Sequence, residues 1–303
     1  MNEVALLLAA TLNSGTPLAI AGLGLLINER VGILNLGAEG MMLIGALTGY
    51  AVTFHTGSEW LGFAAGAGAG ALVAACFGWL VIWLNTNQYA TGLAVSLFGG
   101  GLSAYLGADF VGRKLGEHPD LSIPGLRDVP FLGPALLDHH PLVYLTIAGT
   151  IALAWMLQRT RAGLVLRAVG ESPESAHALG YPVRRIRLLA VVVGGALCGL
   201  AGAYISVVYA PLWAEGMVAG RGWIAFIIII FARWRPANIL WGCLLFAGIN
   251  GLQIRLQVIG VRVPSEFLTA LPYIVTLIVL VLIMSRSGKS RIPSALGQPY
   301  YRE

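Results

Sequence analysis

Charge is scarce in this sequence of 303 residues: only 11% of them are Asp, Glu, Lys or Arg, whereas 57% are hydrophobic. The apolar residues form long uninterrupted blocks instead of amphipathic stripes. This composition excludes an ordinary water-soluble globular protein and is typical of an integral membrane protein. The net charge of +5 comes mainly from arginines between the blocks. It therefore predicts membrane orientation and not a nucleic-acid partner.

Cysteine and the common catalytic motifs are also scarce. Cys76, Cys198 and Cys243 are an odd number, have no CxxC spacing and fall inside apolar blocks, so neither a disulfide framework nor a metal site is predicted. The sequence GKS at 288–290 is not a phosphate-binding loop, because Ile283 occupies the position of the required earlier glycine. There is no HExxH motif. We therefore predict that the chain is not an enzyme and binds no cofactor or metal.

The apolar blocks predict an all-α polytopic membrane protein with about nine transmembrane helices, eight to ten being the range, in a single permease-like domain over 1–303. A polar turn is predicted at Asn28-Glu29-Arg30, between the first two spans. The predicted spans are 4–27, 31–54, 61–84, 89–108, 142–157, 188–209, 223–231, 239–252 and 267–284.

Alternating these spans across the bilayer places the amino terminus outside and the carboxyl terminus in the cytoplasm. Thirteen of the nineteen Lys and Arg residues then lie on the inner side and six outside, as the positive-inside rule requires. In this topology 109–141 is an extracytoplasmic loop, 159–187 a cytoplasmic loop and 285–303 a cytoplasmic tail. The predicted location is the plasma membrane.

The cytoplasmic loop 159–187 carries six of the arginines and contains its own short helix. Ser172 can cap this helix, Pro173 suits its first position, Glu174 suits the positive end of its dipole, and Gly180 closes it. A separate helix at the membrane surface is available to another protein. The alternative is an amphipathic connector that rests on lipid headgroups.

Glu39 is the only acidic residue predicted to lie clearly within a span. A carboxylate there costs roughly 2.5 kcal/mol or more and needs a partner or a wet cavity. A structural role is favoured, either an ion pair with Arg30 or a helix-breaking role, since Gly37 and Gly40 suggest an irregular or broken helix start. The alternatives are a gate or pathway residue, or a carboxylate that reaches interfacial water. One such carboxylate is fewer than a proton-coupled carrier requires.

The tetrapeptide AEGM occurs twice, at 38–41 and at 214–217. The copies lie near the start of the second predicted span and just before the seventh, and these two spans run in opposite directions. That arrangement indicates an inverted-repeat transporter. Chance similarity within Gly/Ala-rich sequence is the alternative.

Four segments carry a resemblance to a known family: NERVGILNLGAEGMMLIGAL at 28–47, NQYATGLAVSLFGGGLSAYLG at 87–107, LRAVGESPESAHALGYPVRRIR at 166–187 and GMVAGRGWIAFIIIIFARWRP at 216–236. They resemble bacterial ABC-transporter permeases of the branch that imports nucleosides and simple sugars, alongside the ribose-type permeases. The match follows the order of nearly the whole chain, which is similar to the shorter of two paired permeases.

The resemblance implies an inner-membrane subunit surrounded by lipid, with three protein partners. These are an ABC ATPase that uses ATP and Mg, a second homologous permease in a heterodimer, and an extracytoplasmic substrate-binding protein or lipoprotein. It also implies that the short cytoplasmic helix is the coupling helix, which docks in a groove of the ATPase. The implied coupling residues are Glu171, Ser172, Pro173, Glu174, Ala176, His177, Leu179 and Gly180, with the contact centred on Pro173, Glu174, Ala176, His177 and Leu179.

An import path for a neutral polar solute should be lined by amides, hydroxyls and occasional aromatic rings. The candidates, each weighed against a packing or turn role, are Asn35, Glu39, Asn85, Gln88, Ser96 and Asn250. The residues do not distinguish a purine nucleoside from a pentose or hexose. Two other classes stay open: an ATP-independent secondary carrier and a membrane scaffold without flux.

Overall fold

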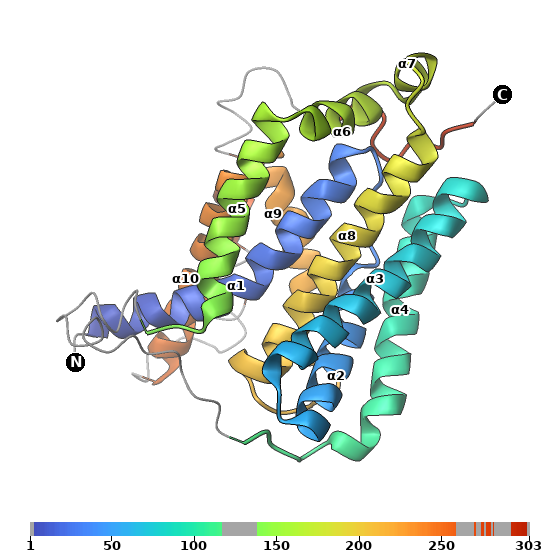
Figure 1. Ribbon diagram of the computed structural model, residues 1–303. Coiled ribbons are helices and arrows are strands. Elements are labelled where there is room, and N and C mark those ends of the chain that lie inside the picture. The colour runs from blue at the N-terminus through green and yellow to red at the C-terminus, as the bar shows by residue number, and fades with distance from the viewer. Residues whose placement is uncertain are drawn as a thin grey trace.

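The computed structural model describes residues 3–116, 138–258 and 292–301, together with Ala270, Ile274, Val275, Leu277, Ile278, Val279 and Val281. The described chain is helical, with two isolated β-bridges in its loops (Figure 1). Its helices are α1 (Glu3–Arg30), α2 (Ala38–Thr56), α3 (Glu59–Trp83), α4 (Gln88–Gly107), the short 3₁₀ turn η1 (Ala108–Phe110), α5 (Pro141–Arg159), α6 (Arg161–Glu171), α7 (Pro173–Ala178), α8 (Val183–Tyr204), the π-helical turn η3 (Ile205–Tyr209), α9 (Arg221–Ala232) and α10 (Pro236–Val258).

Six of these helices are long and apolar enough to cross a membrane: α1, α3, α4, α5, α8 with its π-helical turn, and α10. Helix α9 is a shorter apolar helix. The class of all-helical polytopic membrane protein is therefore confirmed. The ninth predicted span, 267–284, lies largely outside the described residues.

Helix α8 is the centre of the bundle and packs against α1, α2 and α3, whereas α4, α5 and α10 are peripheral (Figure 1). Glycine makes the central contact possible. A Cβ atom on Gly199 of α8 would lie only 2.1 Å from the carbonyl oxygen of Gly66 on α3. Helices in lipid associate through such close backbone approach, since water does not drive them together.

Helix α1 corrects the predicted turn at Asn28-Glu29-Arg30, because the helix continues to Arg30. The chain turns later, through the non-helical residues 31–37, where Gly32 has a φ of +84°. Glu29 is 1% exposed. Glu29 also lies within a helix that is long and apolar enough to span a membrane, so the expectation that Glu39 is the only acidic residue within a span is wrong.

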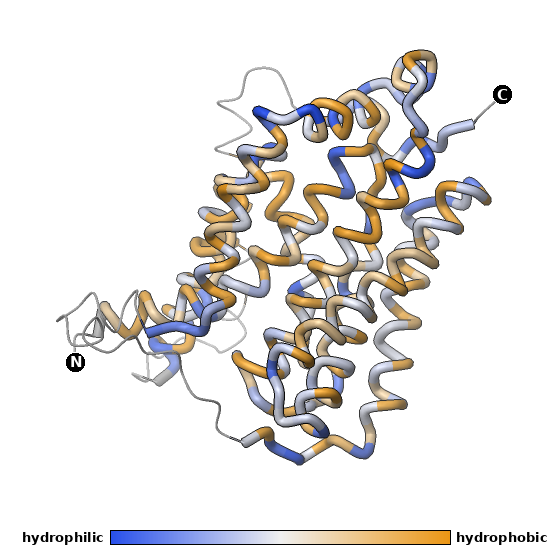
Figure 2. Tube along the Cα trace, in the orientation of Figure 1, coloured by the Kyte–Doolittle hydropathy of each residue, from blue (hydrophilic) through white to orange (hydrophobic). Residues whose placement is uncertain are grey.

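The loop 159–187, predicted to be cytoplasmic, contains two helices, α6 and α7, at one end of the bundle. The short helix expected from its capping residues is confirmed: Pro173 begins α7, the Ser172 hydroxyl accepts the Ser175 N–H at 3.2 Å, and Gly180 ends the turn with a φ of +88°. Figure 2 shows strongly hydrophilic stretches nearby, at the end of α1 and the start of α8.

The C-terminal segment 292–301 lies on the same end of the molecule. The Ala295 N–H donates to the Gly170 carbonyl at 3.0 Å, and the Gly297 N–H donates to the Gly32 carbonyl at 3.1 Å. The Arg187 guanidinium lies over the Tyr300 ring, 5.7 Å from its centroid. This segment therefore joins α6, the turn after α1 and the start of α8.

Candidate functional site: a junction of two half-helices

Helices α2 and α9 begin against each other inside the bundle. A Cβ atom on Gly222, in the first turn of α9, would lie 2.7 Å from the Glu39 Cα in the first turn of α2. From this point α2 runs to the end where α3 begins, and α9 runs to the end where α1 finishes. The two helices therefore point in opposite directions from a shared starting point.

The start of α2 lies near the middle of helix α4. A Cβ atom on Gly40 would lie 2.4 Å from the Val95 carbonyl oxygen, and one on Gly99 would lie 2.5 Å from the Gly40 Cα. Because α4 is itself long enough to span a membrane, its middle marks the middle of the bundle. Transporters place their broken helices and solute sites at this depth.

The Glu39 carboxylate fixes the junction. Its Oε1 accepts the Gly220 N–H at 2.9 Å, and its Oε2 accepts the Gly222 N–H at 2.7 Å. These N–H groups lie at the N-terminus of α9, where a helix has unsatisfied donors and a positive dipole end that favour an anion. The expected ion pair with Arg30 is wrong, because Glu39 lies at the N-terminus of α9 whereas Arg30 donates to the Trp234 carbonyl, beyond the other end of this helix. The expected broken helix start is confirmed.

Three of the predicted pathway residues support the non-helical segment before α2. The Gln88 Oε1 accepts the Leu34 N–H at 2.7 Å, the Ser96 hydroxyl donates to the Leu36 carbonyl at 2.7 Å, and the Asn35 Oδ1 accepts the Gly37 N–H at 3.0 Å. Non-helical backbone survives at membrane depth only where the protein satisfies its polar groups. These three side chains provide hydrogen bonds to the backbone groups of this segment.

The structure thus brings together Asn35, Glu39, Gln88 and Ser96 around residues 34–39. The other two candidates lie elsewhere. Asn85 occupies the turn between α3 and α4 with a φ of +49°, and Asn250 is half-buried on α10.

A second cluster, which the sequence did not reveal, ties the end of α1 to the end of α9. The Trp234 indole Nε1 donates to the Glu29 Oε2 at 2.6 Å, and the Arg30 guanidinium donates to the Trp234 carbonyl. Arg233 and Trp234 both have left-handed φ angles, of +51° and +57°, which turn the indole back toward α1. We call Glu29, Arg30 and Trp234 the clamp.

Helix α6 sits directly on this clamp. A Cβ atom on Gly170 would lie 2.1 Å from the Arg30 carbonyl oxygen, so no side chain fits between the two helices. Contacts therefore run without a gap from α7 through α6, the end of α1 and Trp234 into α9, and from α9 through Glu39 into α2.

The coupling residues expected on α7 divide into exposed and buried groups. Glu174, His177 and Leu179 are exposed, and Leu179 is 76% exposed despite its apolar side chain. Ala176 is 1% exposed and packs into the core, which corrects its expected place in a partner contact. The remaining expected residues flank this surface: Glu171, Ser172, Pro173 and Gly180.

The fold and the junction define a polytopic transport protein, and comparison with known proteins gives its family. Residues 7–284 match the family described as the branched-chain amino acid transport system / permease component. The chain belongs to this family of membrane permeases, and it is a transport component, not an enzyme.

Individual relatives match over almost their whole length. The chain is 39% identical over 327 residues to a putative glucose ABC transporter permease of Haloferax volcanii, TsgC13, covering 100% of this chain and 99% of that protein. It is 30% identical over 316 residues to the guanosine ABC transporter permease NupQ of Bacillus subtilis, covering 99% and 97%. It is also 30% identical over 318 residues to the nucleoside ABC transporter permease NupC of Lactococcus lactis, covering 100% and 98%.

Proposed function

We propose that this chain is the membrane-spanning permease subunit of an ABC importer that moves a nucleoside or a simple sugar into the cytoplasm. The substrates of the relatives support this substrate class: glucose for one and guanosine or nucleosides for the others. A separate ATPase supplies the energy, and a substrate-binding protein delivers the solute.

One observation carries the mechanism: helix α9 is held at both ends. The clamp holds its C-terminal end beside α6, and Glu39 holds its N-terminal end at the junction. Because a twelve-residue helix transmits displacement as a rigid body, a movement of α6 and α7 reaches the junction through α9. Helix α7 is the coupling helix in this mechanism, with Glu174, His177 and Leu179 against the ATPase.

The proposed membrane topology follows from the role of α7 as the coupling helix. With α6 and α7 in the cytoplasm, the amino terminus lies outside, 109–141 is extracytoplasmic, and the nine-span arrangement returns the C-terminal segment to the cytoplasm. The inverted repeat is supported by the opposed half-helices α2 and α9. It is not supported by the AEGM match, because 38–41 opens α2 whereas 214–217 precedes the first residue of α9, Arg221.

A heterodimer with a second permease completes the proposed complex. Two organisms each have two permeases that resemble this chain to different degrees. NupQ and NupP of Bacillus subtilis are 30% and 23% identical to it, and TsgC13 and TsgB13 of Haloferax volcanii are 39% and 24% identical. Such pairs favour a partner that is related to this chain but not a second copy of it.

The proposal is tested by removing the coupling helix. Deletion of 172–180, or Glu174→Arg, should abolish uptake of labelled guanosine and glucose into vesicles that contain the complete complex, while membrane insertion stays intact. Substrate-stimulated ATP hydrolysis should be lost as well. Full uptake by the deletion variant would refute the coupling role and favour an ATP-independent carrier. Absence of flux in the intact complex for every nucleoside and sugar would favour a scaffold.

A further inference from the structure

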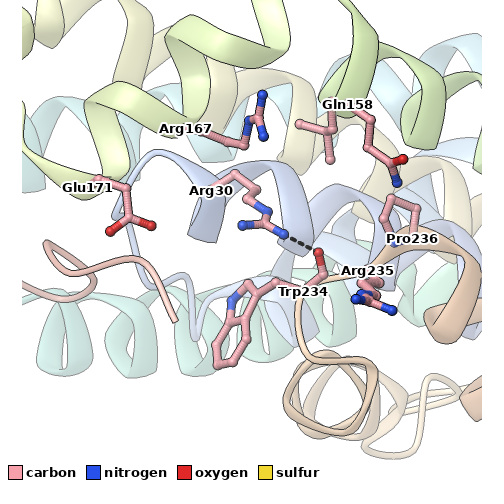
Figure 3. A pocket seen from close by; sticks show the side chains of 8 residues that line it. Arg30, Gln158, Arg167, Glu171, Trp234, Arg235 and Pro236 are labelled. Atoms are coloured by element: carbon pink, nitrogen blue, oxygen red, sulfur yellow. Dashed lines mark hydrogen bonds between the residues drawn. The ribbon is translucent and has the colours of Figure 1, made fainter. Parts of the chain in front are cut away.

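A polar cavity of about 400 Å³ opens beside the clamp (Figure 3). The ends of α1 and α5, helix α6 and the turn between α9 and α10 enclose it. Figure 3 shows Arg30 between Glu171 on one side and Gln158 and Arg235 on the other, with Arg167 above it. The junction, where the proposed function places the solute path, lies at the opposite end of α9.

The charge of the lining selects an anion. Three guanidinium groups and one carboxylate line the cavity. The carboxylate, Glu171, already accepts hydrogen bonds from the Ser294 N–H and hydroxyl at 3.3 and 2.8 Å. Arg167 donates from its Nε to the Gly163 carbonyl at 3.3 Å, a bond that leaves both terminal nitrogens of this guanidinium for a ligand.

Arginine also selects the kind of anion. A guanidinium is a planar fork of donors that matches the oxygen spacing of a phosphate group. Arg167 and Arg235 reach the cavity from different elements, α6 and the turn before α10, so one phosphate can be approached from two sides. Gln158 adds an uncharged amide, which suits the ester or hydroxyl oxygens of a headgroup.

The position of the cavity identifies the source of the phosphate. Its rim is formed by the last turn of α5 and the first turn of α10, both peripheral spans in which only 28% of the apolar window is buried. Leu157 and Pro236 give the wall an apolar part. In the orientation of the proposed function, on which this step rests, the rim lies at the level of the inner-leaflet headgroups. Basic pockets between spans on the cytoplasmic side are typical lipid-headgroup sites.

We propose that this cavity binds the phosphate headgroup of an anionic phospholipid from the cytoplasmic leaflet. The bound headgroup connects α6 to the turn between α9 and α10. The clamp joins the same turn to the end of α1, on which α6 packs, so lipid occupancy stiffens the route from the coupling helix to α9.

The test measures lipid retention by native mass spectrometry on the complete complex, purified from membranes and supplied with either phosphatidylglycerol or phosphatidylcholine. The wild type should retain phosphatidylglycerol in preference to phosphatidylcholine. Arg235→Gln should weaken retention roughly fivefold, the effect of about 1 kcal/mol per basic residue at a membrane surface, and Arg167→Gln with Arg235→Gln should weaken it further. The matched control is Arg161→Gln, an exposed arginine of α6 that is not part of the cavity lining, and it should retain lipid as the wild type does.

Three results would overturn the proposal. The first is equal retention of phosphatidylglycerol by the wild type and the double variant. The second is equal retention of the two lipids by the wild type. The third is displacement of the lipid by millimolar inorganic phosphate, which would assign the cavity to a soluble anion. Arg235 is exposed, so its single variant tests the site without disturbing the fold. Because retention is measured without transport, a failure here is distinct from a failure of the proposed function.

Discussion

The Glu39 carboxylate offers the sharpest test of the junction. Glu39→Gln preserves the size of the side chain but replaces one acceptor oxygen with an NH₂ group, which would face the N–H of Gly220 or Gly222 as a second donor. One hydrogen bond to a charged group is then lost, at about 1.5–3 kcal/mol. The favourable charge at the N-terminus of α9 is lost too, at about 0.3–1 kcal/mol. Together the two losses weaken the contact between α2 and α9 by about 2–4 kcal/mol.

A free-energy change of this size separates α2 from α9 measurably. At 1.4 kcal/mol per factor of ten, the junction should open between roughly thirtyfold and several hundredfold more often. Opening can be followed at Met217, which lies in the turn before α9 and is only partly exposed. Met217→Cys, in a background where the exposed Cys76 is replaced by Ser, should react with a small thiol reagent much faster when Glu39 is Gln.

The AEGM repeat supplies the matched control. Glu215 stands in the second copy of the tetrapeptide and is exposed. Glu215→Gln should therefore leave the labelling rate and the thermal stability of the complex unchanged. Glu39→Gln should raise the labelling rate and lower the thermal stability. If Glu39→Gln labels and melts as the wild type does, the carboxylate does not hold the junction, and the mechanism through α9 is refuted.

Three further predictions concern stability, each measured as the melting temperature of the purified complex. Trp234→Phe leaves the buried Glu29 Oε2 without its donor and should destabilise by about 1–3 kcal/mol; an unchanged melting temperature would contradict the clamp. Gly199→Ala should cost roughly 1–3 kcal/mol because its methyl group meets α3, while Gly68→Ala, which has open space around it, should be neutral. Gln88→Leu leaves the Leu34 N–H without its acceptor and should cost about 1–3 kcal/mol, and a neutral result would mean that another group satisfies this N–H.

The membrane class, most spans and the short helix α7 could be predicted because local chemistry determines them. Backbone groups in lipid must be satisfied within the segment, so long apolar blocks become helices. Helix α7 follows from a capping serine, a proline at the first position and a closing glycine, all within nine residues. The irregular start of α2 likewise followed from Gly37, Gly40 and a carboxylate in an apolar block.

The clamp could not be predicted, because its partners are distant in the sequence. Three consecutive polar residues, Asn28 to Arg30, suggested a turn. In the folded chain Trp234, 205 positions after Glu29, bonds to Glu29 and Arg30 and so allows α1 to continue as a helix through them. The same limit applies to the candidate pathway residues: Gln88 and Ser96 were chosen for their polarity, but their hydrogen bonds to residues 34 and 36 depend on how α4 packs beside that segment.

The C-terminal segment carries a consequence for biogenesis. Residues 292–301 follow every predicted span in the sequence, yet they bond to Gly32 and Gly170 and place Tyr300 beside Arg187 and His177. The support beneath α6 and α7 is thus complete only after the last predicted span has been synthesised. In the proposed function α7 meets the ATPase, so a prematurely terminated polypeptide would present α7 on an incomplete support, and late synthesis of this segment would keep the ATPase from engaging an unfinished permease.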